Sequence, residues 1–294
     1  MKNILVSGTN GYIGSWIFDL LIRNNNVISL NRDCTCKSSD YSRFITYDAF
    51  DELSDTELAS FFKNFDIFIH VASEIDFSPL NTQLTYFNIY KFHSILTRLK
   101  SIGFQKVILI SSAALVSSAG ANNSSEEIQV KAPSLYHFTK YSQEQILNFL
   151  SFDFFYSLRV SSPVGPGLKR KSIFSVLINQ ALNGDEIKLF GKGTREQNYI
   201  DVRDIAELCF SLVYYNLPSG VYNICAPHSI SNYNLAKKII QLSSSQSKIR
   251  YFYEDSEEGI IWNFDSSKAL LNLGFRCRYS IDDSILDYIK HLNS

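Results

Sequence analysis

A tyrosine and a lysine four residues apart, Tyr136 and Lys140, are the side chains in this sequence best suited to acid–base chemistry. On a helix, residues at this spacing lie on one face. A tyrosine phenol ordinarily has a pKa of about 10, which makes it a poor proton donor or acceptor at neutral pH. A neighbouring ammonium group favours the phenolate and lowers that pKa. We therefore predict that Tyr136 exchanges a proton with a substrate and that Lys140 tunes it.

A hydroxyl group that could hold the reacting oxygen is expected at Ser112, within ISSAALVS at Ile110–Ser117. A serine at the carboxyl end of a buried strand can hydrogen-bond a carbonyl or hydroxyl group and hold it for proton transfer. A register shifted by one residue would put Ala113 at this position, and Ser111 or Ser117 would then have to substitute for it.

Three glycines, Gly8, Gly11 and Gly14, lie in SGTNGYIG between an apolar run and a segment with helical periodicity. One glycine permits a tight turn, another lets the backbone approach a pyrophosphate, and the last allows close packing of helix on strand. The helix N-terminus then offers free N–H groups and the positive end of its dipole. The position of this motif predicts a dinucleotide-binding turn.

The elements that must position these residues alternate between strands and helices. Apolar strands joined by amphipathic helices indicate a parallel sheet with helices on both faces, so we expect an α/β, doubly wound fold. The expected strands are Asn3–Ser7, Val27–Leu30, Phe44–Tyr47, Asp66–Val71 and Lys106–Ile110.

The chain changes character near Val160, where the Pro/Gly loop Ser161–Gly167 begins and later segments become less regular. We predict a dinucleotide-binding domain over 1–160 and a smaller α/β substrate domain over 161–294. The stretch Tyr199–Tyr214 reads as a strand and a helix that return to the first domain.

Composition limits the classes of function. The 294 residues are 45% hydrophobic and carry a formal charge of −1, which gives no basic field for nucleic acid or an acidic membrane. None of the five cysteines forms a CxxC pair, so no metal site is expected. No apolar run is long enough for a membrane helix, and Ser7 and Gly8 come too early for a signal peptide. We predict a cytoplasmic protein.

Together the motifs resemble the extended short-chain dehydrogenase/reductase family, of the NAD-dependent epimerase/dehydratase type that modifies nucleotide sugars. The glycine spacing is GxxGxxG, and further landmarks follow in the family's order over nearly the whole chain. They are HVAS (His70–Ser73), ISSAALVS, YHFTK (Tyr136–Lys140), LRVSSPVGPG (Leu158–Gly167), NYIDVRDIA (Asn198–Ala206), GVYNICA (Gly220–Ala226) and DSSKALLNLGF (Asp265–Phe275).

The resemblance implies a Rossmann-type fold and a catalytic set of Ser112, Tyr136 and Lys140, with Ser112 as the favoured hydroxyl. It also implies that Asn88 contacts backbone near the active site. Asp48 fits an acidic contact to the adenine amino group. The residues expected at the cofactor are Gly8, Asn10, Gly11, Tyr12, Ile13, Gly14, Asn31, Arg32, Asp48, Val71, Ala72, Ser73, Tyr136, Lys140 and Pro163.

The choice of cofactor depends on the end of the second strand. A carboxylate there would bind an adenosine ribose and repel a 2′-phosphate, but this chain has Asn31 followed by Arg32. Arg32 can stack on adenine and bind a phosphate. Asp33 follows and weakens the argument. We expect NADP rather than NAD.

Substrate residues depart from the family's pattern. Ser162 replaces a common asparagine and Gln197 replaces an arginine, both of which would face the substrate's diphosphate side. Gln197 carries no charge, so Arg195 or the basic run Lys169–Lys171 would have to compensate. The expected substrate-binding residues are Ser162, Arg195 and Gln197.

Ala113-Ala114 stand where a dehydratase needs an acid/base pair, so dehydration is not expected. The leading hypothesis is NADPH-dependent reduction of a 4-keto nucleotide-activated sugar, a deoxysugar for surface polysaccharide or lipopolysaccharide. The alternatives are a nucleotide-sugar epimerase with retained NAD and a non-catalytic NADP-binding regulator. The expected partner is the small nucleotide-sugar substrate, and a homodimer stays open.

Overall fold

The structure is a computed structural model, and it describes residues 1–33, 43–75, 81–117, 124–130, 132, 134–256 and 258–293. Within these residues a parallel sheet has the strand order β3-β2-β1-β4-β5-β6-β11. The order reverses between β1 and β4, which confirms the doubly wound fold. The strands are β1 (Asn3–Ser7), β2 (Asn26–Asn31), β3 (Phe44–Thr46), β4 (Ile67–His70), β5 (Lys106–Ser112), β6 (Phe154–Val160) and β11 (Gly220–Ile224).

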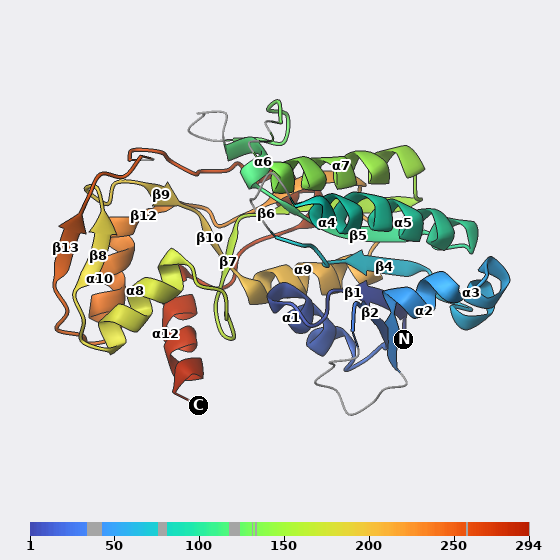
Figure 1. Ribbon diagram of the computed structural model, residues 1–294, viewed down its shortest axis with the longest axis horizontal. Helices are drawn as coiled ribbons and strands as arrows, with labels where there is room; N and C mark the ends of the chain where they lie inside the picture. The colour runs from blue at the N-terminus through green and yellow to red at the C-terminus, as the bar shows by residue number, and fades with distance from the viewer. Residues whose placement is uncertain are drawn as a thin grey trace.

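Helices cover both faces of this sheet, and a second lobe lies beside it (Figure 1). Of the three short strand pairs among the described residues, two lie in that lobe, and the third lies between the lobe and the sheet. The helices are α1 (Tyr12–Leu21), α2 (Tyr47–Glu52), α3 (Asp55–Phe61), α4 (Thr82–Thr85), the π-helix η2 (Tyr86–Lys91), α5 (Phe92–Ser101), α6 (Ala114–Ser117), α7 (Leu135–Leu150), α8 (Ile173–Leu182), α9 (Val202–Tyr214), α10 (Asn232–Leu242), α11 (Ser267–Leu273) and α12 (Ile281–Leu292). The paired short strands are β7 (Ser162–Val164) with β10 (Tyr199–Asp201), β9 (Glu196–Gln197) with β12 (Ile230–Ser231), and β8 (Ile187–Phe190) with β13 (Ile249–Phe252).

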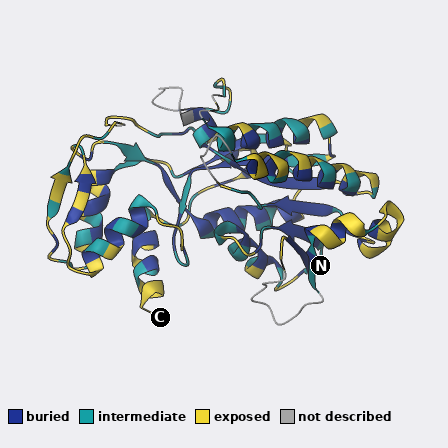
Figure 2. Cartoon of the chain, in the orientation of Figure 1, coloured by how far each residue is buried: buried dark blue, intermediate teal, exposed yellow. Residues whose placement is uncertain are grey.

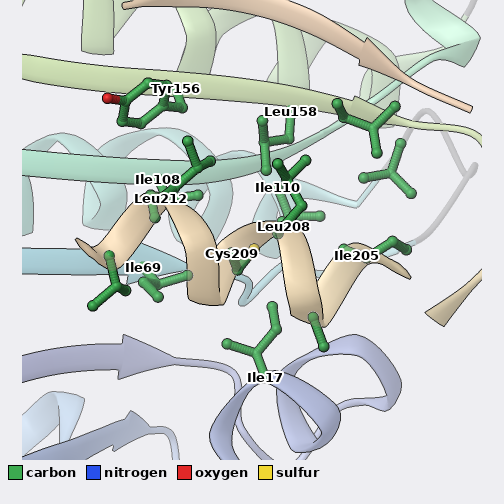
Figure 3. Packing of buried hydrophobic residues seen from close by; sticks show 14 of the residues in the cluster. Ile17, Ile69, Ile108, Ile110, Tyr156, Leu158, Ile205, Leu208, Cys209 and Leu212 are labelled. Atoms are coloured by element: carbon green, nitrogen blue, oxygen red, sulfur yellow. The ribbon is translucent and has the colours of Figure 1, made fainter. Parts of the chain in front are cut away.

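The continuous apolar character of the central strands follows from burial on both faces. Successive strand residues point to opposite sides, so Ile4 and Val6 pack in one core cluster and Leu5 packs in the other. Figure 3 shows part of the first cluster, in which Ile17 of α1 and Leu208 of α9 join residues of the central strands such as Ile108. Figure 2 shows the strands between the helix layers as buried.

A third apolar cluster fills the second lobe, with α8, α10 and α12 around β8. Its members include Phe174, Ile187, Leu235 and Ile285, all fully buried. Figure 1 shows this lobe, which contains α8 and α12, beside one end of the central sheet. The lobe is therefore a packed unit with its own core, as expected for a second, smaller α/β region.

The part of the chain after residue 160 that returns to the central sheet differs from the predicted stretch Tyr199–Tyr214. The helix of the stretch Tyr199–Tyr214, α9, packs against α1 and the sheet, but its strand β10 pairs with β7. The returning strand is β11, which pairs with β6, and α11 lies on the same side as α1. The domain boundary at 160/161 stays a prediction, and the first lobe draws on both sides of it.

Among the described residues, no helix is long and apolar enough to cross a bilayer.

Candidate active site

A cavity of about 730 Å³ opens at the carboxyl end of the central strands. Ligands of doubly wound folds bind at this edge, near the point where the strand order reverses. The wall includes the turn after β1, the ends of β2, β4, β5 and β6, the start of α7 and the segment before α8. The glycine turn and the predicted acid–base residues thus line the same cavity.

The turn after β1 fits an anion such as a pyrophosphate. Gly8 has a φ of 74°, and a Cβ on it would lie 2.5 Å from the backbone nitrogen of Ala72. A Cβ on Gly14 would lie 2.0 Å from the carbonyl oxygen of Gly8. No side chain caps the N-terminus of α1 and no acidic residue lies in its first turn, so its N–H groups are available to an anion.

Buried polar side chains support this turn from beneath. The amide of Asn31 donates to the hydroxyls of Thr9 at 2.8 Å and Ser29 at 2.7 Å, and those two hydroxyls are 2.5 Å apart. Asn31 is almost fully buried. Its amide group therefore helps to fix the glycine turn to the end of β2.

The predicted catalytic set lines the cavity. Tyr136 and Lys140 lie on α7, which begins after the N-cap Ser134, and Ser112 is the last residue of β5. The Lys140 ammonium donates a hydrogen bond of 2.9 Å to the carbonyl oxygen of Ile110. The three side chains thus come from a strand end and the adjacent helix, although their catalytic roles stay predictions.

The ionisation of Tyr136 differs from the expectation. Burial raises the pKa of Tyr136 to about 12, and the nearby Arg170 opposes this shift. Burial also lowers the pKa of Lys140 to about 7, against the opposing effect of Glu144. In the protein without ligands, desolvation therefore outweighs the tuning of Tyr136 that was predicted from its spacing to Lys140.

The alternative registers for Ser112 can be compared directly. The Ser111 hydroxyl donates to Glu144 Oε1 at 2.5 Å and is buried, and Ala113 lies in an apolar cluster. The side chain of Ser117 lies outside the part of the chain that the structure describes. Ser112 is half-buried at the cavity wall, where its hydroxyl accepts the Ala114 N–H at 3.3 Å. The geometry therefore favours Ser112.

Behind Ser111 lies a buried ion pair. Arg159 of β6 donates to both carboxylate oxygens of Glu144 on α7, at 3.0 and 2.8 Å. Both side chains are at most 4% exposed. Because Glu144 lies on α7 one turn after Lys140, this pair joins α7 to the sheet.

Asn88 contacts backbone, in agreement with the resemblance. Its amide accepts from the Glu74 N–H and donates to the Glu74 carbonyl oxygen, both at 2.9 Å, and also donates to Thr139 on α7 at 3.1 Å. Asn88 lies in η2, and π-helical turns are frequent at functional sites.

The remaining predicted residues divide into two groups. All the predicted cofactor residues line the cavity except Asp48, which lies exposed on α2 and contributes nothing to the wall. Ser162 lines the cavity, but Arg195 and Gln197 do not. Gln197 instead accepts a hydrogen bond from the hydroxyl of Tyr199 at 3.1 Å, on the strand β9 that pairs with β12.

Other residues at the wall were not predicted as site residues. They include Glu74, Phe87, His137, Ser172, Trp262 and Phe264. The backbone N–H of Trp262 donates to the carbonyl oxygen of Glu196 at 3.2 Å. The Arg195 guanidinium lies 5.7 Å from the centre of the Trp262 ring. No local pattern marks this contact, since the partners are far apart in sequence. His137 could have been suspected from its place beside Tyr136.

Because burial lowers the pKa of Lys140 from its ordinary 10.5 to about 7, we expect stability to rise with pH. Between these values the unfolded chain binds more protons than the folded protein, so the free energy of unfolding increases as pH rises. From pH 7 to 9 the contribution is roughly 2 kcal/mol. Urea unfolding of ligand-free protein at pH 7, 8 and 9 measures it.

The control is Lys140→Met, which removes this group and should make the rise in stability with pH smaller. Lys106, whose pKa burial lowers to about 8, remains in both proteins and contributes equally. Equal slopes for wild type and Lys140→Met would contradict the assignment.

Comparison with known proteins identifies the family of this chain and shows which solved structures share its fold. Residues 4–225 match the family model described as "NAD dependent epimerase/dehydratase family". A dTDP-D-glucose 4,6-dehydratase of Dictyostelium discoideum is 26% identical over 273 residues, which are 83% of this chain and 62% of that protein. A putative UDP-glucose 4-epimerase of Methanocaldococcus jannaschii is 27% identical over 237 residues, 75% of this chain and 76% of that protein.

Among solved structures, the UDP-glucuronic acid 4-epimerase of Bacillus cereus in complex with NAD superposes with a TM-score of 0.82 at 21% identity. The match covers 100% of this chain and 99% of that one. It extends the shared fold through both lobes.

Proposed function

The chain belongs to the NAD-dependent epimerase/dehydratase family, and from this premise we propose that it is a nucleotide-sugar epimerase that retains its nicotinamide dinucleotide. Such an enzyme inverts one hydroxyl-bearing carbon by oxidising it and then reducing it from the other face. The nicotinamide ring, when bound, supplies the hydride acceptor for the first step and the donor for the second.

The residues of the chain would handle the proton. Tyr136 takes the proton of the sugar hydroxyl as the carbonyl forms and returns it as the hydroxyl is restored. Ser112 hydrogen-bonds the same sugar oxygen and holds it beside the phenol. Lys140, which donates to the Ile110 carbonyl oxygen, lies four residues after Tyr136 on α7, and its positive charge when protonated would favour the phenolate.

The observation that carries this proposal is the distribution of charged groups along the cavity. The carboxylates among its described lining residues, Asp33 and Glu74, lie by the end of β2 and after β4, and Ser112 is followed by Ala113 and Ala114. A dehydratase needs an additional proton donor and acceptor beside the reacting sugar. Neither of these carboxylates lies beside Ser112. The residues there would serve proton transfer at a single oxygen of the sugar, which is what epimerisation requires.

The experiment is to incubate the purified protein with UDP-glucose or UDP-glucuronic acid, the sugar nucleotides named for relatives. NMR of the mixture should show conversion to the 4-epimer without net production of reduced dinucleotide. Chromatography of the heat-denatured protein should release a dinucleotide. A protein that carries no dinucleotide and converts neither substrate would contradict the proposal.

A 4-ketoreductase that consumes NADPH is the second candidate, and Arg32 favours it. The Arg32 side chain is 61% exposed at the cavity edge, where a 2′-phosphate could reach it. In that case a 4-keto nucleotide sugar would oxidise added NADPH stoichiometrically, and the nucleotide sugars above would stay unchanged.

Arg170 rather than Arg195 is expected to bind the substrate's diphosphate. Arg170 and Lys171 line the cavity just before the N-terminus of α8, and Arg195 does not reach the wall. Because charged hydrogen bonds contribute roughly 1.5–3 kcal/mol, Arg170→Ala should raise the Michaelis constant about ten- to a hundredfold. Initial rates over a range of nucleotide-sugar concentrations measure this change.

Lys169→Ala is the matched control, because Lys169 is an exposed neighbour that does not line the cavity. An unchanged Michaelis constant in Arg170→Ala, or an equal rise in the control, would remove Arg170 from the diphosphate site.

A further inference from the structure

The adenosine end of the cavity has an ion pair that joins two strand ends. Arg32, directly after β2, pairs with the carboxylate of Glu74, four residues after the end of β4. The Arg32 guanidinium also lies 5.7 Å from the centre of the Phe87 ring. All three side chains line the cavity, so the pair spans the space between β2 and the segment after β4.

Hydrogen bonds to its backbone hold Glu74 in place. The Asn88 amide bonds both the N–H and the carbonyl oxygen of Glu74, and Asn88 is only 2% exposed. A third bond from Asn88 reaches Thr139, one residue before Lys140. The carboxylate therefore extends from a point fixed to both η2 and α7, and it is only 31% exposed, compared with 61% for Arg32.

The end of β2 lacks the carboxylate that binds an adenosine ribose in many dinucleotide-binding folds. Asn31 is the last residue of β2, and its side-chain N–H groups donate to the hydroxyls of Thr9 and Ser29. Asp33 also lines the cavity but is exposed. Glu74 brings to this end a carboxylate whose backbone is held by Asn88.

We propose that Glu74 is the residue that selects NAD over NADP in this chain, by supplying from β4 the carboxylate that β2 lacks. The proposal rests on the proposed function only in that the cavity holds a nicotinamide dinucleotide. A free ribose hydroxyl can donate a hydrogen bond to this carboxylate. A 2′-phosphate would be repelled by it and would have to compete with it for Arg32. Arg32 then balances the charge of Glu74 and does not serve as a phosphate site.

The test is direct binding of NAD and of NADP to protein stripped of dinucleotide, by isothermal titration calorimetry. Wild type should bind NAD at least about tenfold more tightly than NADP, since charged hydrogen bonds to a ribose are worth this much. Glu74→Gln should reduce that ratio about tenfold or more, chiefly by improving NADP binding. Asp33→Asn is the matched control and should leave the ratio within about threefold of wild type.

A second variant, Arg32→Met, guards against misfolding of Glu74→Gln, and melting curves of all the proteins are recorded. Arg32→Met should keep the preference for NAD. Wild type that prefers NADP, an Asp33→Asn change larger than that of Glu74→Gln, or loss of NAD preference in Arg32→Met would each overturn the proposal. Binding of neither dinucleotide by wild type would overturn the proposed function as well, whereas equal binding of both overturns only the role of Glu74.

Discussion

Tyr136→Phe should fold, retain its dinucleotide and lose turnover by about 10² to 10⁴, the usual range for loss of a general acid–base group. The substitution removes one oxygen atom and keeps the ring, which contacts His137 edge-to-face with centroids 5.4 Å apart. Single-turnover and steady-state rates with a nucleotide sugar measure the loss. The dinucleotide content of the purified variant shows whether the site is otherwise intact.

Tyr141→Phe is the matched control, because Tyr141 lies on the same helix and does not line the cavity. It should have wild-type turnover. If Tyr136→Phe keeps turnover within about tenfold of wild type, another group must transfer the proton, and the proposed mechanism is wrong.

Arg159→Met should lower the free energy of unfolding by about 3–5 kcal/mol, because it leaves the buried Glu144 carboxylate without its charged partner. Arg159 donates two hydrogen bonds to Glu144, and both side chains are almost completely buried between α7 and the sheet. Urea unfolding of ligand-free protein measures the loss.

Two controls separate charge burial from simple loss of packing. The double variant Arg159→Met/Glu144→Leu should recover much of the lost stability, since no unpaired charge stays buried. Arg250→Met breaks an ion pair with Glu186 in which both side chains are at least half exposed, and it should cost less than about 1 kcal/mol. A loss for Arg159→Met no larger than that for Arg250→Met would contradict the argument.

The central sheet could be predicted because its information is local. Strand and helix periods alternate from Asn3 to Val160, and the glycine turn has its own spacing, so both the fold class and the family resemblance are confirmed. Ser112, Tyr136 and Lys140 line one cavity, as predicted, because the strand end and the helix that carry them lie side by side in the predicted fold. Their catalytic roles remain to be tested by the variants above.

Long-range contacts could not be predicted from local pattern. The pairing of Arg32 with Glu74 joins the ends of two strands, and the Trp262 segment reaches the cavity by bonding Glu196. The raised pKa of Tyr136 in the protein without ligands could not be predicted for a related reason. Spacing on a helix gives the distance to Lys140, but burial, which raises that pKa, is created by the whole fold.

The position of β11 has a consequence for how the protein is made. Strand β6 ends at Val160, but its outer neighbour β11 begins only at Gly220, with all of α8 and α9 between them in the chain. During synthesis the outer edge of β6 therefore carries unsatisfied backbone N–H and C=O groups while about 60 further residues emerge, which at 5–20 residues per second takes several seconds. An exposed strand edge is a template for pairing with another chain. Nascent chains that stop between β6 and β11 should accordingly be the forms of this protein that depend most on chaperones.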